Sequence, residues 1–178
     1  NNDFVLQGGS LDLNGNAQVF NGLRVSTATA QNANLVPDIG GTIINTSGTM
    51  ATLGLAAASG SFSGSITGNV ALVRSTTVTT YSDWNIYTAN TYTGPTLLNG
   101  GRTQLLGTAT LSNTSSITIN QATLLLSNNN GTSILDALVD DRINDAAPIT
   151  MSGGMIQYRA RFGSEGTEAF GSLTISKG

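Results

Sequence analysis

The chain has 178 residues, of which 10% are charged, and its formal net charge is −3. Its basic residues are few and scattered and could not neutralise a run of phosphates, which argues against nucleic-acid binding. Cysteine and histidine are both absent, which excludes disulfide frameworks and thiolate metal sites and removes the usual general base. We therefore expect no cofactor, no metal and no enzymatic activity.

The length favours a single domain covering 1–178. No apolar run approaches the length of a membrane helix, so we expect no membrane insertion by this chain. The composition is rich in Thr, Val, Ile and Leu and is punctuated by Gly and Asn, which favours an all-β fold.

Short segments with strand character follow one another through the first half of the chain. Many of them alternate apolar and polar residues, the pattern of a strand with one buried face. Gly-Gly and Asn-Gly pairs lie between them and predict corners, because Gly and Asn adopt positive φ at low cost. The expected strands are 3–7, 10–15, 18–26, 41–46, 50–57, 61–66, 69–75, 77–82 and 84–88.

The same pattern continues in the second half, with one interruption. The expected strands are 96–100, 103–107, 109–113, 116–121, 123–128, 148–153, 155–160 and 172–177. The interruption is 132–147, where apolar residues have roughly helical spacing and Ser133 and Asp136 fit a capping box. We predict a short helix near 133–144, with extended chain from Pro148.

The two ends of the chain share sequence phrases. The segment 5–16 is similar to 150–161, since in both a Gly-Gly pair precedes an alternating strand. Shortly after each, 19–26 is similar to 169–176. This recurrence predicts a domain slightly longer than one unit of a tandem array.

Three architectures suit short strands with frequent corners: a sandwich, a closed barrel and a parallel β-helix. The shortness of the strands favours the coils of a β-solenoid with roughly twenty residues in each turn. Stacked coils also account for the abundant Asn and Thr, because like polar side chains can form ladders between turns.

The segment 89–106, "ANTYTGPTLLNGGRTQLL", carries a family resemblance. It resembles the autotransporter-associated β-strand repeat, also called the passenger-associated transport repeat. Looser similarity extends over 8–23, 41–53, 60–75 and 143–176, although Pro95 replaces a glycine of the family phrase. The matching residues of the central phrase are Asn90, Thr91, Tyr92, Thr93, Gly94, Thr96, Leu98, Gly101, Gln104 and Leu105. The resemblance implies a right-handed parallel β-helix of an exported protein, extracellular or at the bacterial cell surface.

A β-solenoid has open end strands, which are templates for another chain. A head-to-tail contact between such ends does not close and propagates as a filament. We therefore expect a structural protein of a fibre, stalk or adhesin shaft, built by self-stacking or by tandem extension in a longer polypeptide. The expected self-assembly residues lie within 3–26 and 148–177: Phe4, Val5, Leu6, Leu11, Leu13, Ile156, Tyr158, Leu173 and Ile175.

Two alternatives remain open at this point. Aromatic residues cluster at Tyr81, Trp84, Tyr87 and Tyr92, which fits either a contact surface for glycan or host protein, as in an adhesin module, or an aromatic stack within the solenoid. A polysaccharide-acting enzyme is the remote alternative. Its nearest candidate site is an acidic cluster beside an arginine, otherwise explained as a solvated surface: Asp136, Asp140, Asp141 and Arg142.

Overall fold

The computed structural model describes residues 3–25, 40–56, 59–76, 82–128, 138–161 and 163–176. Every regular element in these ranges is a β-strand, and none is a helix. The strands are β1 (Asp3–Val5), β2 (Ser10–Asp12), β3 (Ala17–Phe20), β4 (Gly22–Arg24), β5 (Thr42–Asn45), β6 (Ala51–Ala56), β7 (Gly60–Phe62), β8 (Ser65–Gly68), β9 (Val70–Ser75), β10 (Asp83–Ile86), β11 (Ala89–Asn90), β12 (Thr96–Asn99), β13 (Arg102–Leu105), β14 (Thr110–Leu111), β15 (Ile117–Ser127), β16 (Ile149–Arg159) and β17 (Leu173–Ile175).

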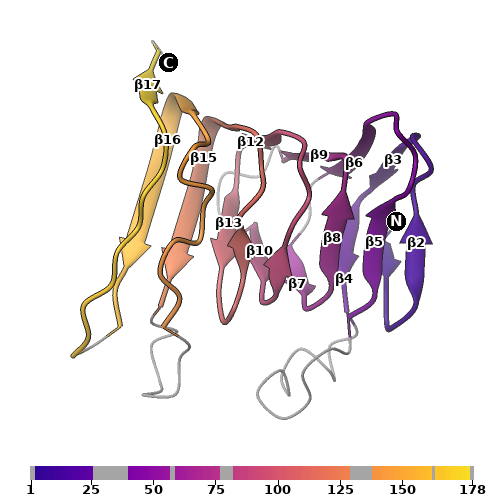
Figure 1. Ribbon diagram of the computed structural model, residues 1–178, viewed down its shortest axis with the longest axis horizontal. Helices are drawn as coiled ribbons and strands as arrows, with labels where there is room; N and C mark the ends of the chain where they lie inside the picture. Colours follow the sequence, from indigo (N-terminus) through magenta and orange to yellow (C-terminus); the bar gives the residue numbers. More distant parts are fainter. Residues whose placement is uncertain are drawn as a thin grey trace.

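The strands form three faces, each a stack of parallel neighbours along the long axis of the molecule (Figure 1). The first face comprises β3, β6, β9, β12, the first halves of β15 and β16, and β17. The second comprises β1, β4, β7, β10, β13 and the second halves of β15 and β16. The third comprises β2, β5, β8, β11 and β14.

The chain visits these faces in a fixed cyclic order. From β3 on the first face it passes to β4 on the second and β5 on the third, and the same order holds up to β17. Paired residues on successive turns are 19 positions apart at Asp83 and Arg102, 21 at Asn99 and Asn120, and 24 at Ser61 and Asn85. A parallel sheet that coils about an axis in this way is compatible with a β-solenoid.

The corner between the first and second faces shows how the sequence turns the chain. Gly100 and Gly101 join β12 to β13 with φ of 74° and 64°. On the next turns Gln121 has φ 48°, and Gly153 and Gly154 have φ 73° and 95°. These residues lie within the long strands β15 and β16, so each of those strands bends from one face to the other. Residues that tolerate left-handed φ therefore set the corner, as Gly and Asn pairs in the sequence predict.

The core consists of the inward-facing residues of the three faces, stacked in columns. On the first face Leu72, Thr96, Ile117 and Ile149 lie in register on successive turns. On the second face Thr103, Leu124 and Ile156 do the same. Residues on either side of them in sequence point outward, because side chains alternate along a strand. This alternation fills the interior of each turn with aliphatic side chains.

Polar side chains form ladders between turns, as the Asn and Thr content predicts. Asn120 Nδ2 donates to Asn99 Oδ1 at 2.8 Å, on paired positions of β12 and β15. Ser152 and Ser176 hydroxyls lie 2.7 Å apart near the last turn. Such pairs join neighbouring turns in addition to the backbone hydrogen bonds.

The helix predicted near 133–144 is corrected by the structure. Residues 138–144 contain no helix, and Ile143 instead forms a parallel bridge to Leu111 on the third face. The remaining part of the prediction, 133–137, lies outside the described residues. The helical spacing is misleading here because Ile143 is buried by pairing with a strand of the preceding turn. The spacing of apolar residues within 132–147 contains no information about that distant strand.

The similar phrases near the two ends occupy different faces. The phrase at 5–16 runs from the second face to the third, whereas 150–161 runs from the first face to the second. In the same way, the phrase at 19–26 runs from the first face to the second, whereas the phrase at 169–176 leads into β17 on the first face. A Gly-Gly corner followed by an alternating strand fits any corner of the coil. The two similar phrases therefore share a local structure but do not occupy equivalent positions in the coil.

Candidate functional site

Apolar side chains that belong to the core are incompletely covered at the N-terminal end. Phe4 of β1 and Phe20 of β3 stack there, with ring centroids 4.6 Å apart and ring planes inclined by 14°. Leu6 and Leu11 are partly buried beside them, and Leu13 is fully buried. Within the described ranges, β1, β2 and β3 each pair with a strand of the following turn and with no other strand. This end therefore presents both apolar side chains and one unpaired edge of each strand.

The C-terminal end is more open. Leu173 and Ile175 of β17 stand in register with Ile149 and Met151, which places them in core columns. Leu173 is nevertheless 46% exposed and Ile175 is 76% exposed. Figure 1 shows β17 and β16 at the opposite end of the stack from β2 and β3.

The second face ends in the same way at the last turn. Ile156 and Tyr158 pair with Leu124 and Leu126, both fully buried one turn earlier. Ile156 and Tyr158 themselves are only partly buried. The core columns thus continue to the last turn, where no further layer of described residues covers them.

The predicted self-assembly residues fall into two groups that the fold brings together at opposite ends. Phe4, Leu6 and Leu11 line the N-terminal end, and Leu13 lies behind them, whereas Val5 points outward from β1. The C-terminal group is Ile156, Tyr158, Leu173 and Ile175.

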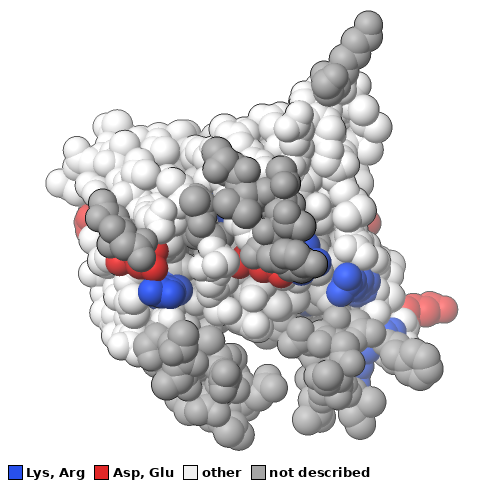
Figure 2. Space-filling view, turned by 180° about the vertical axis from the view of Figure 1, so that it is seen from behind, with Lys and Arg blue, Asp and Glu red and all other residues white. Residues whose placement is uncertain are grey.

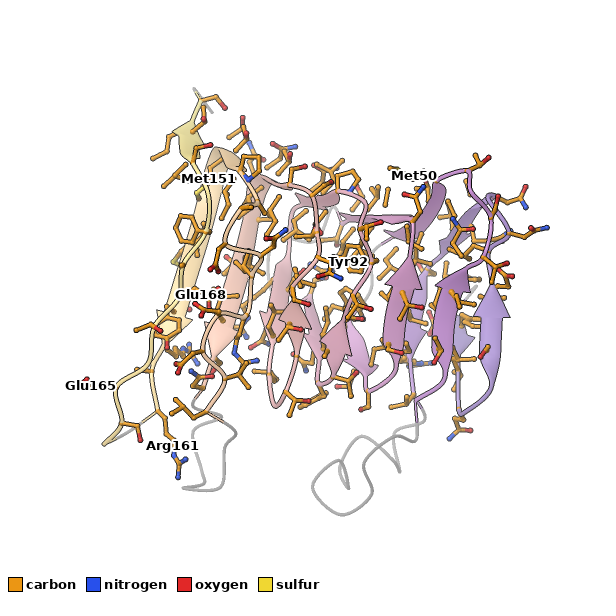
Figure 3. All side chains as sticks on the ribbon, viewed as in Figure 1. Met50, Tyr92, Met151, Arg161, Glu165 and Glu168 are labelled. Carbon is orange, nitrogen blue, oxygen red and sulfur yellow. The ribbon has the colours of Figure 1, made fainter. Side chains whose placement is uncertain are left out.

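Sequence reasoning missed three residues of these ends: Phe20, Met151 and Phe170. Met151 is labelled in Figure 3 beside the last strands of the stack. Each of the three is an apolar residue next to a predicted corner or within a predicted strand, so alternation could have identified them.

Two members of the aromatic cluster, Trp84 and Tyr92, do not lie on the surface. Trp84 is 0% exposed, and its Nε1 donates to the Leu23 carbonyl oxygen at 3.1 Å. Tyr92 is also buried, Tyr87 is half-buried, and Tyr81 lies outside the described residues. For Trp84 and Tyr92 the predicted surface contact is therefore corrected, since an apolar ring with a hydrogen-bonded polar atom is stabilised inside the coil.

Tyr92 instead belongs to a buried polar chain at the corner that leads into β12. Its hydroxyl lies 2.6 Å from Thr96 Oγ1, which lies 2.9 Å from Thr114 Oγ1 on the next turn. Burial raises the pKa of the Tyr92 hydroxyl. Asn90 Oδ1 accepts from the Ile66 N–H at 2.9 Å, so the Asn-Thr-Tyr-Thr phrase joins adjacent turns to one another. Tyr92 is labelled in Figure 3.

Asp136 of the predicted acidic cluster lies outside the described residues, and the other three members do not form a composite site. Asp140 and Asp141 are exposed, whereas the Arg142 side chain is buried and points away into a set of carbonyl oxygens. Its Nη1 donates to the Ala109 carbonyl at 2.6 Å and its Nη2 to the Ser127 carbonyl at 3.0 Å. Burial lowers the pKa of Arg142, which stays a hydrogen-bond donor to the backbone of earlier turns.

Glu168 completes this corner from the last turn. Its two carboxylate oxygens accept from the backbone N–H groups of Arg142 at 2.9 Å and Ile143 at 2.8 Å. Burial raises the pKa of this carboxyl. In Figure 3 Glu168 lies within the fold, while Glu165 and Arg161 lie at its periphery. Arg142 and Glu168 therefore join turns and have no arrangement suited to acid–base chemistry.

Charged side chains are sparse on the face shown in Figure 2, most of which is uncharged. Among the described residues no group of His, Cys, Asp and Glu side chains could hold a metal ion. The described ranges also contain no helix long and apolar enough to cross a membrane.

Comparison of the chain with protein-family models, with curated proteins and with solved structures gives no match. The resemblance to the autotransporter-associated repeat therefore stays a prediction from the sequence. The two open ends are the candidate functional site that the geometry itself provides.

Proposed function

We propose that this chain is a structural module of an extracellular or cell-surface assembly, such as a fibre, stalk or adhesin shaft. In this proposal the module is a right-handed parallel β-helix, and its ends connect it to further modules by stacking or by tandem extension. Crossover connections between parallel strands of one sheet are right-handed in about 98% of cases, which supports that hand.

One observation carries the proposal: the core columns run to both ends of the strand stack, where the described residues cover them only in part. Ile175 is 76% exposed although its column neighbour Met151 faces the core. Exposed apolar surface of this kind marks an interaction site, and here it coincides with unpaired strand edges. A covering module would satisfy both at once, because added strands supply backbone partners and apolar contacts together.

Ile175→Lys tests the proposal. A lysine at this position places a charge where a stacked module would bury it, which is strongly unfavourable without a partner. We expect the wild-type chain to form oligomers that grow with concentration in light scattering and filaments of constant width in negative-stain images. The Ile175→Lys protein should be largely monomeric with an unchanged circular dichroism spectrum.

Met50→Lys is the matched control. Met50 is 47% exposed and lies between β5 and β6 (Figure 3), one turn inside the N-terminal end and far along the stack from Ile175. This substitution should leave assembly unchanged. A wild-type chain that is monomeric at every concentration, in material with no further copies of the module, would contradict the proposal. Equal loss of assembly in both variants would show that the sides of the module form the contact.

A further inference from the structure

We propose, on the basis of the function proposed above, that the partner at each end is a second copy of this chain, stacked head to tail. The second copy has one defined rotation about the long axis of the stack, which we call its phase. In this phase β17 of one copy pairs with β3 of the next, and the second half of β16 pairs with β1. The three faces then continue unbroken from copy to copy.

The order in which the chain visits the faces supports this phase. β17 ends the described chain on the first face, and β1 begins it on the second face, which is the next face in the cycle. A second copy in this phase therefore repeats the geometry of every internal turn. Either rotated phase would place strands of one face over a different face, whose strands differ in length and corner position.

The columns define which residues meet on the first and second faces. On the first face, the register from β3 to β17 places Phe20, Leu55, Leu98, Met151 and Ile175 at equivalent inward positions. The next copy's Phe20 would therefore cover Ile175. On the second face, Val25 N–H donates to the Ser61 carbonyl at 2.9 Å, which aligns β4 with β7 and completes a column from Phe4 to Ile156. The next copy's Phe4 would cover Ile156.

The third face adds one more apolar contact. Phe170 packs against the core on the last turn, whose backbone joins the third face where Asp141 N–H donates to the Thr167 carbonyl at 3.3 Å. Leu11 faces the core at the N-terminal end of the third face, in register with Ile43. In the proposed phase both side chains lie at the junction, so the third face also contributes apolar surface to the contact.

The first-face edges also lack the usual protection against pairing. Native proteins commonly place charges or proline on exposed edge strands. β17 has the sequence Leu-Thr-Ile and β3 has Ala-Gln-Val-Phe, without a charge or a proline. Val19 on β3 is 66% exposed on the outer side of the sheet. Two unprotected edges at opposite ends of one face are expected of strands that pair with each other.

Cysteine pairs can identify the phase because the chain contains no cysteine. Adjacent strands lie about 4.8 Å apart, within the roughly 4.4–6.8 Å between Cα atoms that a disulfide spans. We use four outward-facing positions as single-cysteine proteins: Thr174→Cys, Val19→Cys, Gln157→Cys and Val5→Cys. Each of the two C-terminal variants, Thr174→Cys and Gln157→Cys, is mixed with each of the two N-terminal variants, Val19→Cys and Val5→Cys. The four mixtures are prepared at a concentration at which the wild-type chain assembles and are then oxidised.

The proposed phase predicts cross-linked dimers in two mixtures: Thr174→Cys with Val19→Cys, and Gln157→Cys with Val5→Cys. The other two mixtures should show no cross-link above the wild-type background. Each protein therefore occurs in one matched and one mismatched mixture and serves as its own control for folding and thiol reactivity.

Each contrary pattern has a distinct meaning. Cross-linking of Gln157→Cys with Val19→Cys, or of Thr174→Cys with Val5→Cys, identifies one of the two rotated phases and overturns this inference while retaining end-to-end assembly. A cross-link of Thr174→Cys with itself indicates tail-to-tail contact and overturns the head-to-tail arrangement. Assembly without any cross-link overturns the inference in favour of side contacts, and a strictly monomeric chain overturns both the inference and non-covalent stacking.

Discussion

Trp84 offers a direct test of the interior packing, through its replacement by alanine. Trp84 of β10 pairs with Gly60 of β7, which has no side chain. The indole fills the space above this glycine, and Nε1 reaches beyond it to donate to the Leu23 carbonyl of β4 at 3.1 Å. One side chain thus connects three successive turns of the second face.

The expected loss follows from burial. Truncating a fully buried tryptophan to alanine costs about 3–5 kcal/mol, from lost transfer free energy and a residual cavity. Trp84→Phe keeps most of the ring but removes the donor to Leu23, and leaving a buried carbonyl unpaired costs about 1–3 kcal/mol. Because domains unfold with about 5–15 kcal/mol in total, Trp84→Ala should remove a large fraction of the stability.

Urea unfolding followed by far-ultraviolet circular dichroism measures these differences. Tyr87→Ala is the matched control, because Tyr87 comes from the same aromatic cluster but is only half-buried. We expect the unfolding midpoint to fall in the order Tyr87→Ala, Trp84→Phe, Trp84→Ala, with the last lowest. A loss below about 1 kcal/mol for Trp84→Ala, the range typical of surface substitutions, would refute the interior placement.

Two further predictions concern a corner and a buried carboxyl. Gly101→Ala should destabilise by at least about 1 kcal/mol more than Gly9→Ala in the same unfolding assay. Both have left-handed φ, which costs an alanine about 1–2 kcal/mol, but only at Gly101 would the new Cβ lie 2.6 Å from Thr76 Cγ2 and 2.8 and 2.9 Å from the Arg74 guanidinium nitrogens. Equal losses would show that the Thr76 and Arg74 side chains both move aside freely. Burial raises the pKa of Glu168, so the folded state holds this proton more tightly than the unfolded state, and the contribution of Glu168 to stability falls as pH rises above the ordinary pKa of a glutamic acid. The difference in unfolding free energy between wild type and Glu168→Gln should therefore decrease with pH over this range, and an increase would contradict the sign.

Local chemistry in the sequence predicts much of this fold. The Asn99-Gly100-Gly101 corner and the short strands around it follow from positive φ and period-two alternation, both of which are properties of a few adjacent residues. The end residues Leu173 and Ile175 were predicted in the same way, from alternation in the last strand.

What the sequence could not provide is contact between turns. Arg142 lies in a charged stretch, yet its guanidinium is buried by carbonyl oxygens of Gly107, Ala109 and Ser127, two of them more than thirty residues away. Trp84 is likewise buried because Gly60 lies beneath it. Both outcomes depend on which residues stack one turn apart, and the varying length of the turns conceals that register from a reading of neighbouring positions.

The same stacking separates assembly from folding in this molecule. Within the described ranges the strand pairs join each turn to the turn before it and the turn after it, so stability is close to a sum of nearest-neighbour contributions, to which the Trp84–Leu23 hydrogen bond adds a contact two turns apart. A substitution at Leu98 disturbs its contacts with two turns, whereas one at Ile175 disturbs its contact with a single turn and the uncovered end. Variants at the ends can therefore abolish stacking while the interior remains folded. The open ends are for this reason the one place where a change in association can be measured independently of a change in stability.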